Sequence, residues 1–211
     1  MHRDIPRSPA RRLAGYLEAR LVESDTPLIV ALDGRSGAGK STTAQGAAAL
    51  LNAGEGEKPR ADVIEGDQFY GGGSAELWEQ LSLPERLDRV MDWRRQLDVL
   101  RALREEGWAR WRCFDWDSAE WQGDEPPLCA VYRYSCAAPL ILLDGVYSGR
   151  PELADAIDLR VLLKPDEDER RKRLREREGE DYDPDWERRW AEVEEYYFRH
   201  VVADADYALV L

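Results

Sequence analysis

Residues 34–41 read Gly-Arg-Ser-Gly-Ala-Gly-Lys-Ser, the glycine-rich pattern G-x-x-x-x-G-K-[ST] of a phosphate-binding loop. The glycines permit a tight turn whose N–H groups point inward at an anion. The lysine places a cation on the β- and γ-phosphates, and the next hydroxyl can ligate Mg²⁺. The pattern therefore predicts a site for ATP and Mg²⁺, held by Gly34, Arg35, Ser36, Gly37, Ala38, Gly39, Lys40, Ser41 and Thr42.

Two aspartates follow apolar runs that are typical of strands. Asp67 comes directly after the run 61–66 and could accept the proton of a substrate hydroxyl while orienting it. Asp144 follows four consecutive aliphatic residues, a position that suits the Mg²⁺-associated carboxylate of phosphoryl-transfer sites. We therefore expect Ser41, Asp67 and Asp144 to surround the metal ion. The alternatives are a turn aspartate at 67 and a helix-capping aspartate at 144.

Three arginines, Arg170, Arg173 and Arg177, are spaced so that one face of a helix carries all of them. Such a row of guanidinium groups on a mobile helix could close over ATP and neutralise charge in the transition state. The alternative is a solvated face that is paired with the many acidic residues of the same segment.

The elements that must position these residues alternate between strands and helices. The run 27–33 predicts a buried strand immediately before the glycine-rich loop, and 40–51 predicts a helix immediately after it, so that a helix N-terminus points at the anion. Alternation of this kind predicts an α/β fold of the P-loop NTPase type, a parallel sheet with helices on both faces. Its ligands bind beyond the carboxyl ends of the strands. The other expected strands are 61–66, 109–114, 129–134, 139–145, 157–163 and 207–211, and the other expected helices are 9–24, 84–107, 166–178 and 184–202.

The chain has 211 residues, which suits a single domain over 1–211 with a small helical lid at about 166–180 and an aromatic acceptor-binding region at about 67–135. Its net charge of −13 argues against a nucleic acid polymer as partner. No run approaches the roughly 20 apolar residues of a membrane span, and the N-terminal residues lack an apolar signal core. These features predict a cytoplasmic protein without a membrane partner.

Several segments resemble the uridine kinase-like group of P-loop kinases. The glycine-rich loop followed by Asp67-Gln68-Phe69-Tyr70 resembles that group's loop and Asp-x-Phe-Tyr acceptor motif. Phe114-Asp115-Trp116 resembles its Tyr-Asp-Phe segment, which contacts the nucleoside. Segment 144–146 resembles its Glu-Gly-Ile, with Asp in place of Glu, and the arginine-repeat helix and residues 194–211 resemble its lid and its closing helix and strand.

The resemblance implies a kinase that moves the γ-phosphate of ATP to a hydroxyl, with Asp67 as base and Mg²⁺ required. Lys40 and the three arginines of 170–177 would assist the transfer. The favoured acceptor is a pyrimidine nucleoside, uridine or cytidine, and homo-oligomerisation stays open. The residues expected to contact the acceptor are Asp67, Tyr70, Phe114, Asp115, Trp116 and Arg133.

The chain also departs from that group. The histidine that normally follows the nucleoside-contacting segment is absent from 117–121. The region is rich in tryptophan. We expect Trp93 and Trp108 to pack in the core, while for Trp116 and Trp121 both packing and contact with substrate stay open. Another alcohol, such as a vitamin precursor, a sugar or an antibiotic, therefore remains an alternative acceptor.

Two further functions were considered. A nucleoside monophosphate kinase needs cations for the acceptor phosphate, and Arg94, Arg95, Arg112 and Arg133 could supply them. A GTP-dependent switch would carry an Asn-Lys-x-Asp motif, but the one asparagine of the chain, Asn52, is followed by alanine. The sequence therefore favours a small-molecule kinase over a regulatory NTPase.

Overall fold

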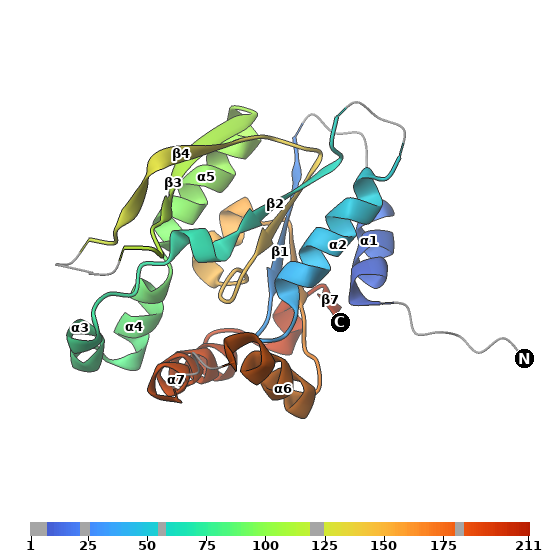
Figure 1. Cartoon of the computed structure of the whole chain (residues 1–211). Helices are drawn as coiled ribbons and strands as arrows, with labels where there is room; N and C mark the ends of the chain where they lie inside the picture. Colours follow the sequence, from blue (N-terminus) through green and yellow to red (C-terminus); the bar gives the residue numbers. More distant parts are fainter. Residues whose placement is uncertain (1–7, 22–25, 55–57, 119–124, 180–183) are drawn as a thin grey trace, which may run out of the picture.

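The computed structural model describes residues 8–21, 26–54, 58–118, 125–179 and 184–211. Its centre is a five-stranded sheet with the order β2-β5-β1-β6-β7, in which every pairing is parallel (Figure 1). This arrangement confirms the predicted α/β fold. The strands are β1 (Leu28–Asp33), β2 (Ala61–Glu65), β5 (Leu140–Asp144), β6 (Leu159–Leu162) and β7 (Leu209–Val210).

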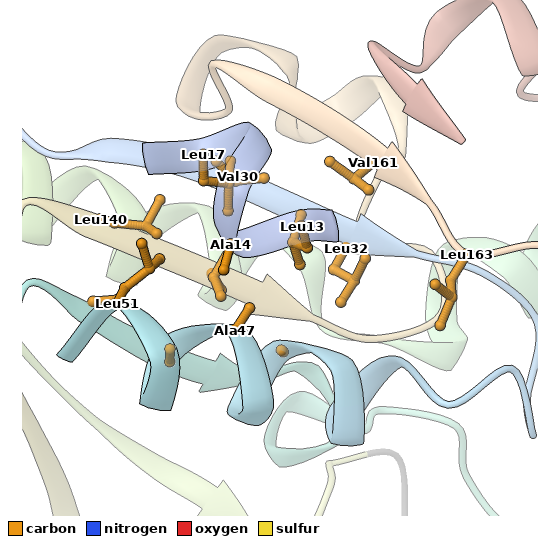
Figure 2. Close-up of a cluster of buried hydrophobic side chains, with 14 of the residues drawn as sticks. Leu13, Ala14, Leu17, Val30, Leu32, Ala47, Leu51, Leu140, Val161 and Leu163 are labelled. Carbon is orange, nitrogen blue, oxygen red and sulfur yellow. The ribbon is translucent and has the colours of Figure 1, made fainter. Parts of the chain in front are cut away.

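Helices α1 (Pro9–Glu18) and α2 (Lys40–Asn52) cover one face of the sheet. Successive side chains of a strand point to opposite faces, so Val30 and Leu32 of β1 both face these helices. They pack there with Leu13 and Leu17 of α1, and all four are fully buried (Figure 2). This cluster fixes the direction of α2 and therefore the position of the loop that precedes it.

The opposite face is covered by α5 (Trp93–Glu105) and a separate antiparallel hairpin, β3 (Trp108–Phe114) with β4 (Leu128–Cys136). Ile29 of β1 packs on this side with Leu100 and Leu103 of α5. Trp93 packs against the same cluster, as predicted. Trp108 was predicted in the core, and this was wrong: it lies at the edge of the hairpin and is 44% exposed.

The single helix predicted over 84–107 is in fact two, α4 (Leu83–Val90) and α5, and α3 (Ala75–Gln80) was not predicted. Met91 is extended between them and forms an isolated bridge with Tyr70. Asp92 then caps α5, because its side chain accepts a hydrogen bond from the N–H of Arg95 at 3.1 Å. The apolar period continues through this break, so the sequence pattern concealed it.

Two further helices, α6 (Glu167–Glu178) and α7 (Pro184–His200), lie at the end of the sheet where α2 begins (Figure 1). Short 3-10 segments complete the chain: η1 (Gly66–Phe69), η2 (Pro151–Ala156) and η4 (Asp204–Asp206). None of the helices in the described ranges combines the length and the apolar content that a membrane span requires.

Candidate active site

The glycine-rich loop connects β1 to the N-terminus of α2, as predicted. Gly34 has φ of 146° and Gly37 has φ of 77°, a region that L side chains rarely adopt. A Cβ at Gly34 would lie 2.5 Å from the carbonyl oxygen of Leu163, and one at Gly37 would lie 2.9 Å from that of Arg170. Glycine is therefore required at both positions, by conformation and by space. The loop leaves the free N–H groups of the helix N-terminus facing outward, where they can bind an anion.

A cavity of about 640 Å³ lies in front of this loop. It brings together most of the residues that the sequence predicted, although they come from five separate segments of the chain. The predicted residues that line it are Ser36, Gly37, Gly39, Lys40, Ser41, Thr42, Asp67, Trp116, Asp144, Arg170, Arg173 and Arg177. Glu65, Met91, Val146, Trp190 and Glu194 line it too and were not predicted.

Asp67 lies in the short 3-10 turn η1 directly after β2, and its side chain is exposed where the cavity opens. The next residue, Gln68, is buried and fixed on both sides. It donates to Glu65 at 2.7 Å and accepts a hydrogen bond from the indole N–H of Trp111 at 2.8 Å. Asp67 therefore projects from a rigid turn, which suits a group that must hold a substrate hydroxyl in place.

Asp144 ends β5 and is almost completely buried beside Ser41. Burial raises the pKa of its carboxyl to about 6; the hydrogen bond from Ser41 and the charge of Lys40 oppose this shift, and Asp67 and Glu65 add to it. One carboxylate oxygen, Oδ1, is buried with no hydrogen-bond partner among the described residues. An unsatisfied buried oxygen beside a hydroxyl suits a hard cation.

These donors fit Mg²⁺. The Ser41 hydroxyl and the Asp144 carboxylate are oxygen ligands of the kind that Mg²⁺ prefers, and the ion usually keeps several water and phosphate ligands besides. Among the described residues no three His, Cys, Asp or Glu side chains come close enough to form a closed metal cage. Asp67 therefore stays a predicted neighbour of the ion, with a water molecule between them as the simplest link.

The raised pKa of Asp144 predicts a pH-dependent stability that Asp144→Asn removes. Folding favours the neutral carboxyl, so the stability it contributes is full below about pH 4 and is lost as the pH rises through the folded-state pKa of about 6. A shift of about 2 pKa units corresponds to on the order of 3 kcal/mol. The measurement is urea unfolding in Mg²⁺-free buffer. Between about pH 4 and pH 6, the free energy of unfolding of Asp144→Asn should rise relative to that of the wild type, and the difference should persist above pH 6. A difference that does not vary with pH would contradict this.

The arginines of α6 divide into two roles. Arg170 is well ordered by neighbours: one nitrogen, Nη1, donates to the carbonyl oxygen of Ser36 at 2.7 Å, and the other two bind Glu167 at 2.7 and 2.9 Å. Arg173 reaches the loop itself, since its Nη1 lies 3.4 Å from where a Cβ of Gly39 would be. It also binds Glu169 at 2.9 Å, one helical turn away. Arg170 therefore supports the loop through Ser36, while Arg173 brings its charge beside Gly39.

An aromatic cluster contributes two side chains, Trp116 and Trp190, to the wall of the cavity. The ring of Tyr70 stacks on Trp116 at 5.1 Å between centroids, meets Phe114 edge-on at 4.9 Å and lies 5.5 Å from Trp190. Tyr70 and Phe114 are buried, and Trp116 is 57% exposed. The two buried rings therefore hold Trp116 in place, and Trp116 and Trp190 present their surfaces to the cavity.

Four predicted acceptor contacts do not line this cavity: Tyr70, Phe114, Asp115 and Arg133. Tyr70 and Phe114 are buried and pack against Trp116, which does line it. Arg133 lies opposite Trp111 on the exposed strand β4, and Asp115 bonds the N–H of Asp117 in the turn that follows β3. Trp121 lies outside the described residues.

Sequence reasoning missed a buried hub at Asp33. Its carboxylate accepts hydrogen bonds from the N–H groups of Gly34, Tyr147 and Gly149 and from two tyrosine hydroxyls, Tyr197 and Tyr207, at 2.7–3.1 Å. Tyr147 has φ of 68°, uncommon for a bulky residue and often found at functional sites. The hub ties the first residue of the loop to the segment after β5 and to the C-terminal part of the chain.

Solved structures similar to this chain share its fold, while no family model and no curated protein matches it. A possible uridine kinase from Bacillus stearothermophilus matches with a TM-score of 0.66 and 17% identity, covering 96% of this chain and 97% of that one. A candidate fructose transport system kinase from Silicibacter gives 0.61 and 20%, covering 97% and 99%. D-glycerate 3-kinase from Cryptococcus neoformans gives 0.60 and 14%, covering 90% and 88%. The chain thus has the fold of the P-loop kinases, as its motifs predicted.

Proposed function

We propose that this protein is an ATP-dependent kinase that transfers the γ-phosphate to a hydroxyl of a small, uncharged molecule with a planar ring, most simply a nucleoside such as uridine or cytidine. One observation carries the proposal: a single cavity is lined both by the phosphate cradle and by an aromatic surface with a carboxylate, Asp67. That pairing of donor and acceptor sites is what phosphoryl transfer requires.

The residues divide the work as follows. The N–H groups of the loop and the Lys40 ammonium hold the β- and γ-phosphates. Asp67 accepts the proton of the acceptor hydroxyl and aligns its oxygen with the γ-phosphorus. Arg173 and Arg177 place positive charge beside the negative charge of the phosphoryl group in the transition state. Helix α6 covers the site and excludes water from it. Ser41 and Asp144 would hold Mg²⁺, which would neutralise part of the phosphate charge.

The charges of the cavity support an uncharged acceptor. Among the described residues, the basic side chains that line it are Lys40, Arg170, Arg173 and Arg177, which come from the loop and α6. The other charged or aromatic side chains of the lining include Asp67, Glu65 and the two tryptophans. Among the described residues that line the cavity, no basic side chain beyond those of the loop and α6 is therefore left to bind a carboxylate or phosphate of the acceptor.

The arginines that a nucleoside monophosphate kinase would need are occupied elsewhere. Arg95 donates to the carbonyl of Arg112 at 2.6 Å, and Arg112 in turn donates to the carbonyl of Cys129 at 2.6 Å. Arg94 is 3.5 Å from Asp88. None of these three lines the cavity. These contacts favour a neutral acceptor over a monophosphate.

The test is an acceptor panel with ATP and Mg²⁺, read as ADP release. We expect nucleosides to raise ADP release well above the rate measured without an acceptor. Nucleoside monophosphates and glycerate should leave ADP release at that rate. Neutral sugars, vitamin alcohols and aminoglycoside antibiotics belong in the same panel, because a planar ring is the feature that should separate active from inactive acceptors. Turnover only with phosphorylated or carboxylated acceptors would overturn the proposal.

Replacing Trp116 by Ala should weaken acceptor binding. A base stacked on an aromatic side chain gains about 1–3 kcal/mol, so KM for the acceptor should rise roughly 5- to 150-fold. KM for ATP should stay within about twofold, since Trp116 lies away from the phosphate loop. Trp108→Ala is the matched control, because Trp108 is also partly exposed but lies at the edge of the hairpin. Equal effects of the two substitutions on acceptor KM would argue against Trp116 as a stacking surface.

A further inference from the structure

Ser36, in the middle of the glycine-rich loop, is held by side chains of both α6 and α7. Its N–H lies 3.1 and 3.3 Å from the two carboxylate oxygens of Glu194, and its hydroxyl donates to the same carboxylate. Its carbonyl oxygen accepts a hydrogen bond from Arg170 at 2.7 Å. Each polar group of Ser36 is therefore bound by a side chain from a distant part of the chain.

Glu194 is itself firmly placed. It is 2% exposed, and it lies on α7 one turn before Tyr197, on the same face of the helix. Tyr197 donates to one oxygen of Asp33 at 2.7 Å, and the other oxygen of Asp33 accepts from the N–H of Gly34 at 2.8 Å. One turn of α7 therefore holds the segment 33–36 at both of its ends.

A buried carboxylate beside a phosphate site needs a physical reason, because its charge repels the ligand and its burial is costly. Its bonds to Ser36 supply one. By binding the N–H of residue 36, Glu194 removes that donor from the phosphate site and fixes the orientation of the Ser36 peptide. The N–H groups of Gly37 and of 39–42, which line the cavity, can then bind phosphate, whereas that of Ala38 is bonded to the carbonyl of Arg35.

Resting on the proposed kinase function, we infer that Glu194 is a positioning residue of the phosphate cradle. It acts through Ser36 and not by touching the nucleotide, and it makes the seating of α7 a condition for ATP binding. Two effects of its charge compete: repulsion weakens ATP binding, whereas alignment of the cradle strengthens it. We infer that alignment is the larger effect. Neutralising Glu194 should therefore weaken ATP binding, whereas dominant repulsion would make neutralisation strengthen it.

The experiment is calorimetric titration of a non-hydrolysable ATP analogue with Mg²⁺, without acceptor, into the full-length chain. Glu194→Ala should weaken binding by about tenfold or more, since charge-assisted hydrogen bonds to the loop are lost. Glu194→Gln keeps the shape and one acceptor oxygen, so its loss should be smaller. Glu195→Gln is the matched control: the neighbouring residue pairs with Arg35 of the same loop, at 2.6 Å, but on the exposed surface. Its effect should stay within about twofold.

A double-mutant cycle separates positioning from a general effect on folding. If Glu194 acts through Ser36, Ser36→Ala and Glu194→Gln should be strongly non-additive in their effect on affinity. Unchanged or tighter binding by Glu194→Gln, or additive effects in the cycle, would overturn the inference while leaving the kinase proposal intact. A wild-type chain that does not bind the analogue would overturn both. Should Glu194→Ala fail to fold, the Gln variant and the cycle still decide.

Discussion

Asp67→Asn should lower kcat by roughly 10²-fold or more, the contribution expected of a general base that accepts a proton in the transition state. Asparagine keeps the size and the hydrogen-bonding reach of the side chain but cannot take the proton of the acceptor hydroxyl. Because Asp67 projects from a turn held by the buried Gln68, the substitution should leave the fold unchanged. The measurement is steady-state ADP release with a nucleoside acceptor.

Two controls give this result its meaning. Affinity for ATP with Mg²⁺ should remain largely unchanged in Asp67→Asn, which shows that the cradle is intact. Asp98→Asn, at an exposed position on α5, makes the same chemical change far from the cavity and should leave kcat at the wild-type value. Normal turnover by Asp67→Asn would remove the carboxylate from the mechanism.

Lys40→Ala should reduce phosphoryl transfer by about 10²–10³-fold, the effect of deleting one preorganised charge from a transition-state site. The ammonium group is buried at the first turn of α2 and borders the cavity, where its field is poorly screened by water. Binding of ATP should weaken as well, because in the proposed mechanism the lysine also contacts the β- and γ-phosphates in the ground state. The measurement is the ADP-release assay together with titration of the ATP analogue.

The matched control for Lys40 is Lys58→Ala, which removes an exposed lysine and should leave both readings unchanged. Lys40 also donates to the carbonyl of Arg35 at 3.1 Å, so thermal unfolding of Lys40→Ala should be compared with the wild type. A well-folded Lys40→Ala with near-normal activity would exclude the glycine-rich loop from the chemistry.

The sequence predicted those parts of the site whose chemistry is local. The glycine-rich loop needs its residues at fixed spacing, and a strand before it with a helix after it follows from short-range patterns. Asp67 and Asp144 could be predicted for a related reason: the carboxyl ends of parallel strands meet at one edge of the sheet. The structure places both at the cavity.

The parts that could not be predicted depend on contacts between distant residues. Glu194 binds Ser36 from 158 positions away, and Asp33 receives the hydroxyl of Tyr207 from 174 positions away. In the sequence, Glu194 is one acid among many on a charged helix, and nothing distinguishes it from Glu195. Only the packing of α7 against the loop makes one buried and leaves the other exposed.

The position of Arg133 on strand β4 explains why it does not line the cavity. Arg133 was predicted as an acceptor contact and as a cation that could bind an acceptor phosphate, but β4 is the outer strand of the hairpin, and its register places Arg133 opposite Trp111. Trp190 was missed for the converse reason. It lies on a helix remote in sequence from the aromatic region, yet α7 brings it within 5.5 Å of Tyr70.

The most direct test follows the γ-phosphate itself. ATP labelled at the γ-phosphorus is incubated with Mg²⁺, uridine or cytidine, and either the wild type or Asp67→Asn, and the products are separated. We predict that the wild type moves the label onto the nucleoside hydroxyl, with ADP formed in equal amount, and that Asp67→Asn moves about one hundredth as much or less. Label that stays in ATP, or that is released only as inorganic phosphate with every acceptor of the panel, would contradict the account.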